Sequence, residues 1–141
     1  MVLLDIIHLE DEEGLWRFPA GRYAAKMGMG YLGVGSLELL EISLNGISAK
    51  VYILDGVFPR TAGGLKELLA EEAMHLVRSK DPSATIFLHT ATSTLEPTAE
   101  RFGARFYDKV SCDAEKIIKE TKPYIERYQA PVAQPQSLTQ A

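Results

Sequence analysis

Residues 58–73, FPRTAGGLKELLAEEA, place a proline, an arginine and two adjacent glycines between an apolar run and a helical pattern. Apolar side chains recur at helical spacing from Leu65 to Val77, which predicts an amphipathic helix over residues 65–79. The preceding run, KVYILDGVF, predicts a strand. The glycines therefore allow two interpretations: a tight turn, or a backbone cradle in which the first N–H groups of a helix bind an anion.

The segment before this strand predicts a β-hairpin. LELLEISL (residues 37–44) and ISAKVYIL (residues 47–54) both look like strands, and Asn45-Gly46 separates them. Both turn residues tolerate the positive φ that a type I′ turn requires. We therefore expect these two strands to pair antiparallel.

The rest of the chain predicts further strands and helices in alternation. The expected elements are a strand at 2–9, one or two short helices at 11–28 broken at Pro19 and Gly21, a glycine-rich connection at 28–36, a strand at 84–92, a short helix at 93–103, a strand at 104–112 and a helix at 113–128 disturbed at Pro123. Trp16, Phe18 and Tyr23 are expected to anchor the second segment to the core. This order predicts an α/β (α+β) fold with a mixed sheet in one domain, residues 1–128, followed by a Pro/Gln-rich tail, residues 129–141.

Composition excludes several classes of protein. The 141 residues carry a net charge of -4 and are 46% hydrophobic, so no global basic field favours nucleic acid or an anionic membrane surface. No run approaches the roughly 18 apolar residues of a membrane span, and the N-terminus lacks the basic region of a signal peptide. The single Cys112 excludes an internal disulfide. We therefore expect a cytoplasmic protein.

Two motif searches give negative predictions. GMGYLG (residues 28–33) matches G-x-G-x-x-G, but a helical pattern precedes it and a strand follows, the reverse of a dinucleotide site. His8, His75 and His89 lie far apart and show no metal-ligand spacing. We accordingly predict no dinucleotide site and no metal site.

The stretch from residue 37 to about residue 110 resembles the GCN5-related N-acetyltransferase (GNAT) family. Arg60 and Gly63 fall on the arginine and first glycine of that family's R-x-x-G-x-G/A segment, and ERFG (residues 100–103) follows a second pattern. The resemblance implies a mixed, mostly antiparallel sheet flanked by helices, the acyl-CoA N-acyltransferase fold. Two positions depart from the family's pattern: Leu65 replaces the second glycine, and Ala99 replaces a tyrosine that protonates the departing thiolate.

The resemblance also implies a site for acetyl-CoA as co-substrate. In the family, backbone amides of this segment bind the pyrophosphate, and a strand-end amide, here that of Val57 or a neighbour, polarises the thioester carbonyl. The residues that would bind the cofactor are Val57, Arg60, Thr61, Ala62, Gly63, Gly64, Leu65 and Lys66.

A general base would have to accept a proton from the attacking amine. Asp55 is the first candidate because it ends the strand just before the glycine turn, although an Asp-Gly carboxylate also commonly stabilises a turn. Glu41, with Glu38, could face an acceptor cleft, and His89 would titrate near neutrality if exposed.

Three functions follow. The first is acetyl-CoA-dependent N-acetyltransfer by direct attack of a primary amine, on a small molecule or on a protein. The second is a GNAT-fold structural or interaction protein without catalysis, such as an internal component of a phage virion with a virion assembly partner or a homo-oligomeric state. The third is an α/β binding domain unrelated to the family.

Overall fold

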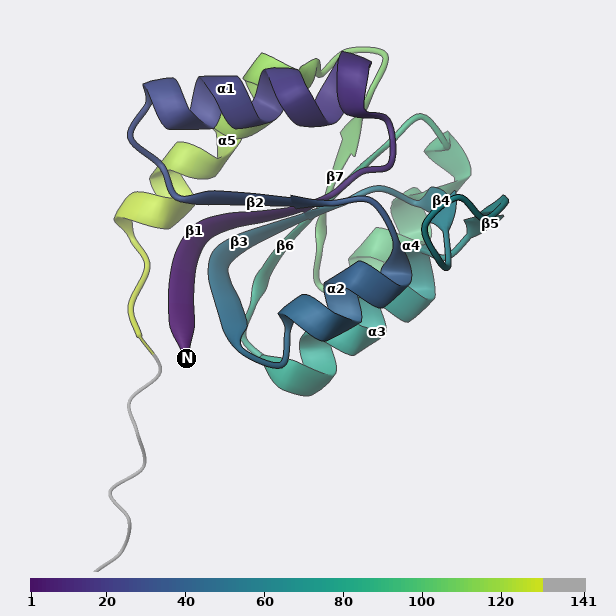
Figure 1. Ribbon diagram of the computed structural model, residues 1–141, viewed down its shortest axis with the longest axis horizontal. Helices are drawn as coiled ribbons and strands as arrows, with labels where there is room; N and C mark the ends of the chain where they lie inside the picture. Colours follow the sequence, from purple (N-terminus) through teal and green to yellow (C-terminus); the bar gives the residue numbers. More distant parts are fainter. Residues whose placement is uncertain (131–141) are drawn as a thin grey trace, which may run out of the picture.

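The centre of the molecule is a parallel sheet of five strands in the order β2-β1-β3-β6-β7 (Figure 1). The computed structural model describes residues 1–130, so residues 131–141 of the predicted tail lie outside the described part of the chain. The strands are β1 (Val2–Leu9), β2 (Tyr31–Val34), β3 (Ile47–Leu54), β6 (Thr85–Thr90) and β7 (Arg105–Asp108).

Helices cover both faces of this sheet (Figure 1). The short helix η1 (Glu13–Arg17), α1 (Phe18–Lys26) and α5 (Ala114–Glu126) lie on one face; α2 (Leu37–Ser43), α3 (Ala70–Lys80), the turn η2 (Ser93–Leu95) and α4 (Glu96–Arg101) lie on the other. Ile6 and Ile53 point into the first layer, whereas Ile7 and Leu54 point into the second. Burial on both faces explains why the strands read as continuous apolar runs.

The predicted mixed, mostly antiparallel sheet is wrong, and so is the predicted hairpin. Residues 37–43 form helix α2, because the Ser36 side chain accepts a hydrogen bond from the Leu39 N–H at 3.2 Å and caps the first turn. Leu37 and Leu40 are buried on one face of this helix. Strand β3 then pairs parallel with β1 on one side and β6 on the other.

The glycine-rich connection contains a strand that the sequence did not predict. Strand β2 pairs with residues Ile6–Leu9 of β1 and forms one edge of the sheet. It is short and contains Gly33, so its intrinsic strand propensity is weak, and the pairing with β1 stabilises the extended conformation. The predicted breaks at Pro19 and Gly21 are absent, because Pro19 occupies the first turn of α1, where its missing N–H costs nothing.

The helix predicted over 65–79 begins only at Ala70. Before it, β4 (Val57–Pro59) and β5 (Lys66–Leu68) form an antiparallel hairpin at the carboxyl edge of the main sheet (Figure 1). The two glycines lie in its turn, where Gly63 has φ of 76° and the Gly64 N–H donates to the Thr61 carbonyl at 3.0 Å. The tight-turn interpretation therefore describes them, and they do not begin a helix.

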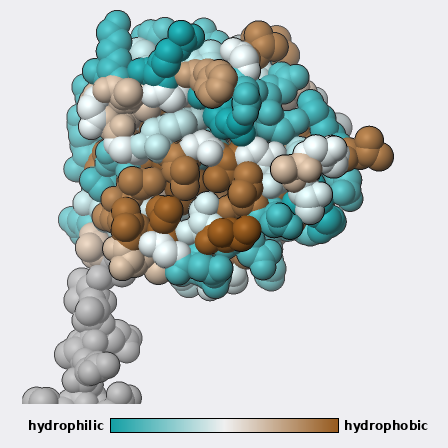
Figure 2. Space-filling view, in the orientation of Figure 1, coloured by the Kyte–Doolittle hydropathy of each residue, from teal (hydrophilic) through white to brown (hydrophobic). Residues whose placement is uncertain are grey.

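Apolar side chains are exposed over one side of the molecule. Figure 2 shows them gathered where the edge strand β2 and helix α2 lie. The exposed apolar residues of α2 and of the start of β1 are Val2, Leu3, Leu39 and Ile42. Of the predicted aromatic anchors, Trp16 and Tyr23 are partly buried, but Phe18 is exposed and the prediction for it is wrong. No helix within residues 1–130 is long and apolar enough to cross a membrane.

Candidate functional site

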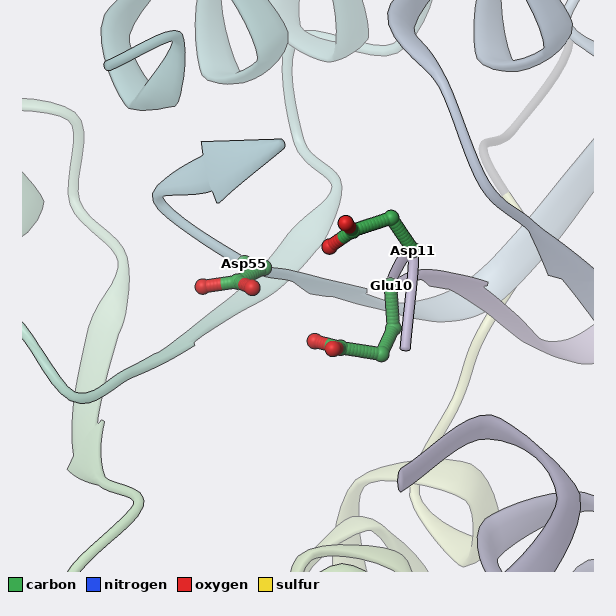
Figure 3. A group of neighbouring side chains, drawn as sticks. All are labelled: Glu10, Asp11 and Asp55. Carbon is green, nitrogen blue, oxygen red and sulfur yellow. The ribbon is translucent and has the colours of Figure 1, made fainter. Parts of the chain in front are cut away.

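Three carboxylates meet at the carboxyl edge of the sheet (Figure 3). Glu10 and Asp11 directly follow β1, and Asp55 directly follows the neighbouring strand β3. One oxygen from each of the three side chains lies within 4.8 Å of the others. Adjacent parallel strands end at the same edge, so the topology places these residues together although 44 positions separate Asp11 from Asp55 in sequence.

A largely buried lysine joins two of these carboxylates. Lys109 directly follows β7, and its Nζ lies 2.7 Å from Glu10 Oε2 and 3.1 Å from Asp55 Oδ2. Burial, followed by repulsion from the Asp55 carboxylate, raises the pKa of Glu10 to about 8. The Lys109 ammonium opposes this shift but does not outweigh it.

The other oxygen of Asp55 and the hydroxyl of Thr90 complete the site. Asp55 Oδ1 accepts a hydrogen bond from the Gly56 N–H at 2.6 Å, which fixes the carboxylate plane. Thr90 ends β6 and is buried. Thr90, Asp55 and Lys109 line one open cavity of about 370 Å³.

Asp11 differs from the other two carboxylates because Lys109 does not contact it. Its Oδ1 is buried and has no hydrogen-bond partner, an arrangement that costs free energy unless a ligand satisfies the oxygen. Three carboxylates around such an orphaned oxygen fit a hard divalent cation such as Mg²⁺, which prefers oxygen ligands. The spacing of histidines in the sequence could not indicate this group, because its ligands are carboxylates that follow two separate strands and form no local motif.

His89, a candidate base, lies beneath the site. Its side chain is buried, and its Nε2 is 2.7 Å from the Cys112 carbonyl oxygen. The rings of His89 and Trp16 pack edge to face, with their centroids 5.2 Å apart. Burial lowers the pKa of His89 to about 4, so the ring is neutral at pH 7. The indole of Trp16 also contacts Lys109, whose Nζ lies 4.7 Å from the ring centroid.

The remaining predicted residues lie in three separate places. Val57 and Lys66 line the same cavity as Asp55, one from each strand of the hairpin. Glu41 lies on α2 and shares a different surface hollow with Glu38, Arg60 and Thr61. The glycine turn extends away from any helix N-terminus, so Ala62, Gly63, Gly64 and Leu65 form no helix-end cradle for a diphosphate.

Sequence reasoning missed Glu10, Asp11, Thr90 and Lys109. Each lies at or just after the end of one of three strands, β1, β6 and β7, and the sequence already predicted a strand at all three places. The signal that could have found them is this shared position, which has meaning only once the strands are known to be parallel.

Comparison with solved structures identifies the architecture. A CheY-like response regulator receiver domain protein from Methanospirillum hungatei matches with a TM-score of 0.71 at 12% identity over 88% of this chain and 94% of its own. The non-phosphorylated HemR receiver domain from Leptospira biflexa matches with a TM-score of 0.70 at 15% identity, over 94% of this chain and 100% of its own. The BeF₃-activated receiver domain of nitrogen regulatory protein C matches with a TM-score of 0.68 at 19% identity, over 92% of this chain and 100% of its own. No protein-family model and no curated protein matches the sequence. At these identities the likeness establishes the fold: a receiver-type, doubly wound α/β domain.

This fold overturns the acetyltransferase resemblance. The matched structures are receiver domains with a parallel sheet, so the GNAT fold, the N-acetyltransferase activity, the acetyl-CoA co-substrate and the inactive GNAT or virion alternative are all wrong. The apparent motif arose because residues 58–73 combine a glycine turn with a later helix, and an unpredicted strand separates the two.

Gly56, next to Asp55, has no room for a larger side chain. A Cβ at Gly56 would lie 2.4 Å from Leu95 Cδ1 and 3.1 Å from Thr90 Oγ1, so Gly56→Ala is expected to lower the free energy of unfolding by about 1–3 kcal/mol. Gly46→Ala is the matched control, because its Cβ would meet nothing within 4 Å, and it should change stability by less than about 0.5 kcal/mol. Urea unfolding of both variants tests this, and equal effects would contradict the packing described.

Proposed function

We propose that the protein is a phosphoacceptor domain in which Asp55 receives a phosphoryl group and thereby changes how the domain binds a partner protein. The observation that carries this proposal is the Asp55 carboxylate held between the Lys109 ammonium and the Glu10–Asp11 pair in an open cavity. The similarity to response regulator receiver domains supports it, since one of those domains is described as BeF₃-activated and another as non-phosphorylated.

The proposed reaction is a direct transfer. An oxygen of the Asp55 carboxylate attacks the phosphorus of an acyl phosphate or another phosphorylated donor. The phosphorus–oxygen bond to the donor breaks, the donor leaves with the electron pair, and an aspartyl phosphate forms. Such a reaction depends mainly on positioning and on charge stabilisation, both of which the surrounding side chains can supply.

Each neighbouring residue has a separate task in this reaction. Gly56 N–H and Lys109 Nζ hold opposite oxygens of the Asp55 carboxylate, so its orientation is set before the donor arrives. Once the phosphoryl group is attached, the Lys109 ammonium can donate a charged hydrogen bond to one of its oxygens. The Thr90 hydroxyl is a further hydrogen-bond donor on the cavity wall. Glu10, Asp11 and Asp55 would hold Mg²⁺, which supplies positive charge for the phosphoryl oxygens when bound.

Phosphoryl uptake with a small donor tests the proposal. Incubation with acetyl phosphate and Mg²⁺ should add the mass of one phosphoryl group to the intact protein, and chelation of Mg²⁺ with EDTA should prevent the addition. The measurement is intact-protein mass spectrometry on freshly quenched samples. Uptake that is independent of Mg²⁺, or no uptake with Mg²⁺ present, would contradict the proposal.

A further inference from the structure

A second lysine reaches the acidic cluster from the β4–β5 hairpin. Lys66 Nζ lies 3.4 Å from Asp11 Oδ2 and 3.7 Å from Glu12 Oε1. Its side chain is about half exposed, whereas that of Lys109 is only about 10% exposed. The hairpin occupies the connection between the Asp55 strand and α3, so the segment that follows the proposed phosphoacceptor also carries this cation.

The position of Lys66 is set by the hairpin and its attachments. Lys66 pairs with Pro59 across the two strands, and the next residue toward the turn, Arg60, donates hydrogen bonds of 2.7 and 2.8 Å to both carboxylate oxygens of Glu72 on α3. At the base of the hairpin the Leu69 N–H donates to the Gly56 carbonyl at 3.0 Å. These contacts hold the hairpin against the body of the domain and direct Lys66 to the cluster.

The two lysines divide the three carboxylates between them. Lys109 contacts Glu10 and Asp55, and Lys66 contacts Asp11, whose second oxygen is the buried one without a partner. The Lys66 Nζ therefore places a positive charge 3.4 Å from an oxygen of the carboxylate that would bind the cation. A divalent cation that binds Asp11 would therefore meet an ammonium already placed there.

We propose that Lys66 is an internal competitor for the divalent cation, and that its half-exposed side chain must leave Asp11 before the cation binds. This inference rests on the proposed function, because it concerns the same three carboxylates. It assigns a regulatory role to the hairpin: a partner that draws Lys66 away, for example with its own carboxylate, would raise cation affinity and so prime the domain for phosphorylation.

Mg²⁺ affinity of matched lysine variants tests the inference. Lys66→Met removes the competing charge but keeps a long apolar stem, and it should lower the Kd for Mg²⁺ about fivefold, the effect of removing two exposed ion pairs. Lys66→Arg keeps the charge and should retain the affinity of the unmodified protein within about twofold.

Lys122→Met is the control variant. Lys122 is exposed to a similar extent and also pairs with a carboxylate, Glu126, but it lies near the C-terminal end of α5, which runs away from the carboxyl edge of the sheet. Trp16, the single tryptophan, lines the cavity and contacts Lys109, so its fluorescence reports Mg²⁺ binding; calorimetry gives an independent Kd.

The outcomes separate the inference from the proposed function. Tighter binding by Lys66→Met alone supports the competition. Equal affinity in Lys66→Met and Lys122→Met, with Mg²⁺ bound by all the variants, overturns the role of Lys66 and leaves the phosphoacceptor site standing. Mg²⁺ binding by none of the proteins overturns both.

Discussion

Asp55→Asn is expected to lower phosphoryl uptake from acetyl phosphate more than about a hundredfold, because the amide has no anionic oxygen to attack phosphorus. The change is nearly isosteric, and the amide oxygen can still accept the hydrogen bond from the Gly56 N–H. The domain should therefore fold while it loses the reaction. Intact-protein mass spectrometry at a fixed time, with Mg²⁺ present, measures the loss.

Asp81→Asn is the control for this substitution. Asp81 follows α3 at the opposite edge of the sheet, so the same chemical change there should leave uptake unchanged. Undiminished uptake in Asp55→Asn would show that another side chain accepts the phosphoryl group, and the assignment of Asp55 would be wrong.

Each of two buried histidines is expected to lower the free energy of unfolding by about 2 kcal/mol between pH 7 and pH 5. Glu10, whose pKa burial raises to about 8, opposes them by about 2–3 kcal/mol over the same range, so the expected net fall is about 1–2 kcal/mol. Burial lowers the pKa of His8 to about 3 and that of His89 to about 4, whereas the unfolded chain titrates near 6.5. Between those values the unfolded state binds more protons than the folded state, so acid favours unfolding. The stabilisation that depends on the two neutral histidines is fully present above pH 6.5 and is lost as the pH falls.

Histidine variants distinguish this effect from that of the carboxylates. His89→Gln should remove the contribution of about 2 kcal/mol that His89 makes to the loss between pH 7 and pH 5. The stability of this variant at pH 7 will also be lower, because the contact with the Cys112 carbonyl changes. His75 is exposed on α3, so His75→Gln should leave the pH dependence as it is. Urea unfolding at the two pH values measures both, and an unchanged pH dependence in His89→Gln would contradict the burial argument.

Part of the fold was predictable because apolar runs mark buried strands. The runs over 2–9 and 47–54 correspond closely to β1 and β3. The short helix predicted at 93–103 contains η2 and α4, which ends two residues before Gly103, a glycine with φ of 66°. The segment 37–44 failed because LELLEISL satisfies both a strand and a helix, and the Asn45-Gly46 pair favoured a hairpin. Ser36 favours the helix, because its side chain caps the first turn.

The direction of the strands was not predictable from local pattern. An apolar run shows that a strand is buried but not which strand lies beside it, and the parallel order depends on helices crossing both faces. Asp55 was chosen for its place at a strand end, which is also why the fold brings it to the cluster. Glu10 and Asp11 belong to the acidic run EDEE, and nothing in this local pattern indicates that their side chains lie beside Asp55.

The most direct test of the central claim is to locate the phosphoryl group. After incubation with acetyl phosphate and Mg²⁺, borohydride reduction converts an aspartyl phosphate to homoserine, which tandem mass spectrometry of peptides can place at one residue. We expect homoserine at position 55 and at no other aspartate. Homoserine at Asp11 or at a surface aspartate, with Asp55 unmodified, would contradict it.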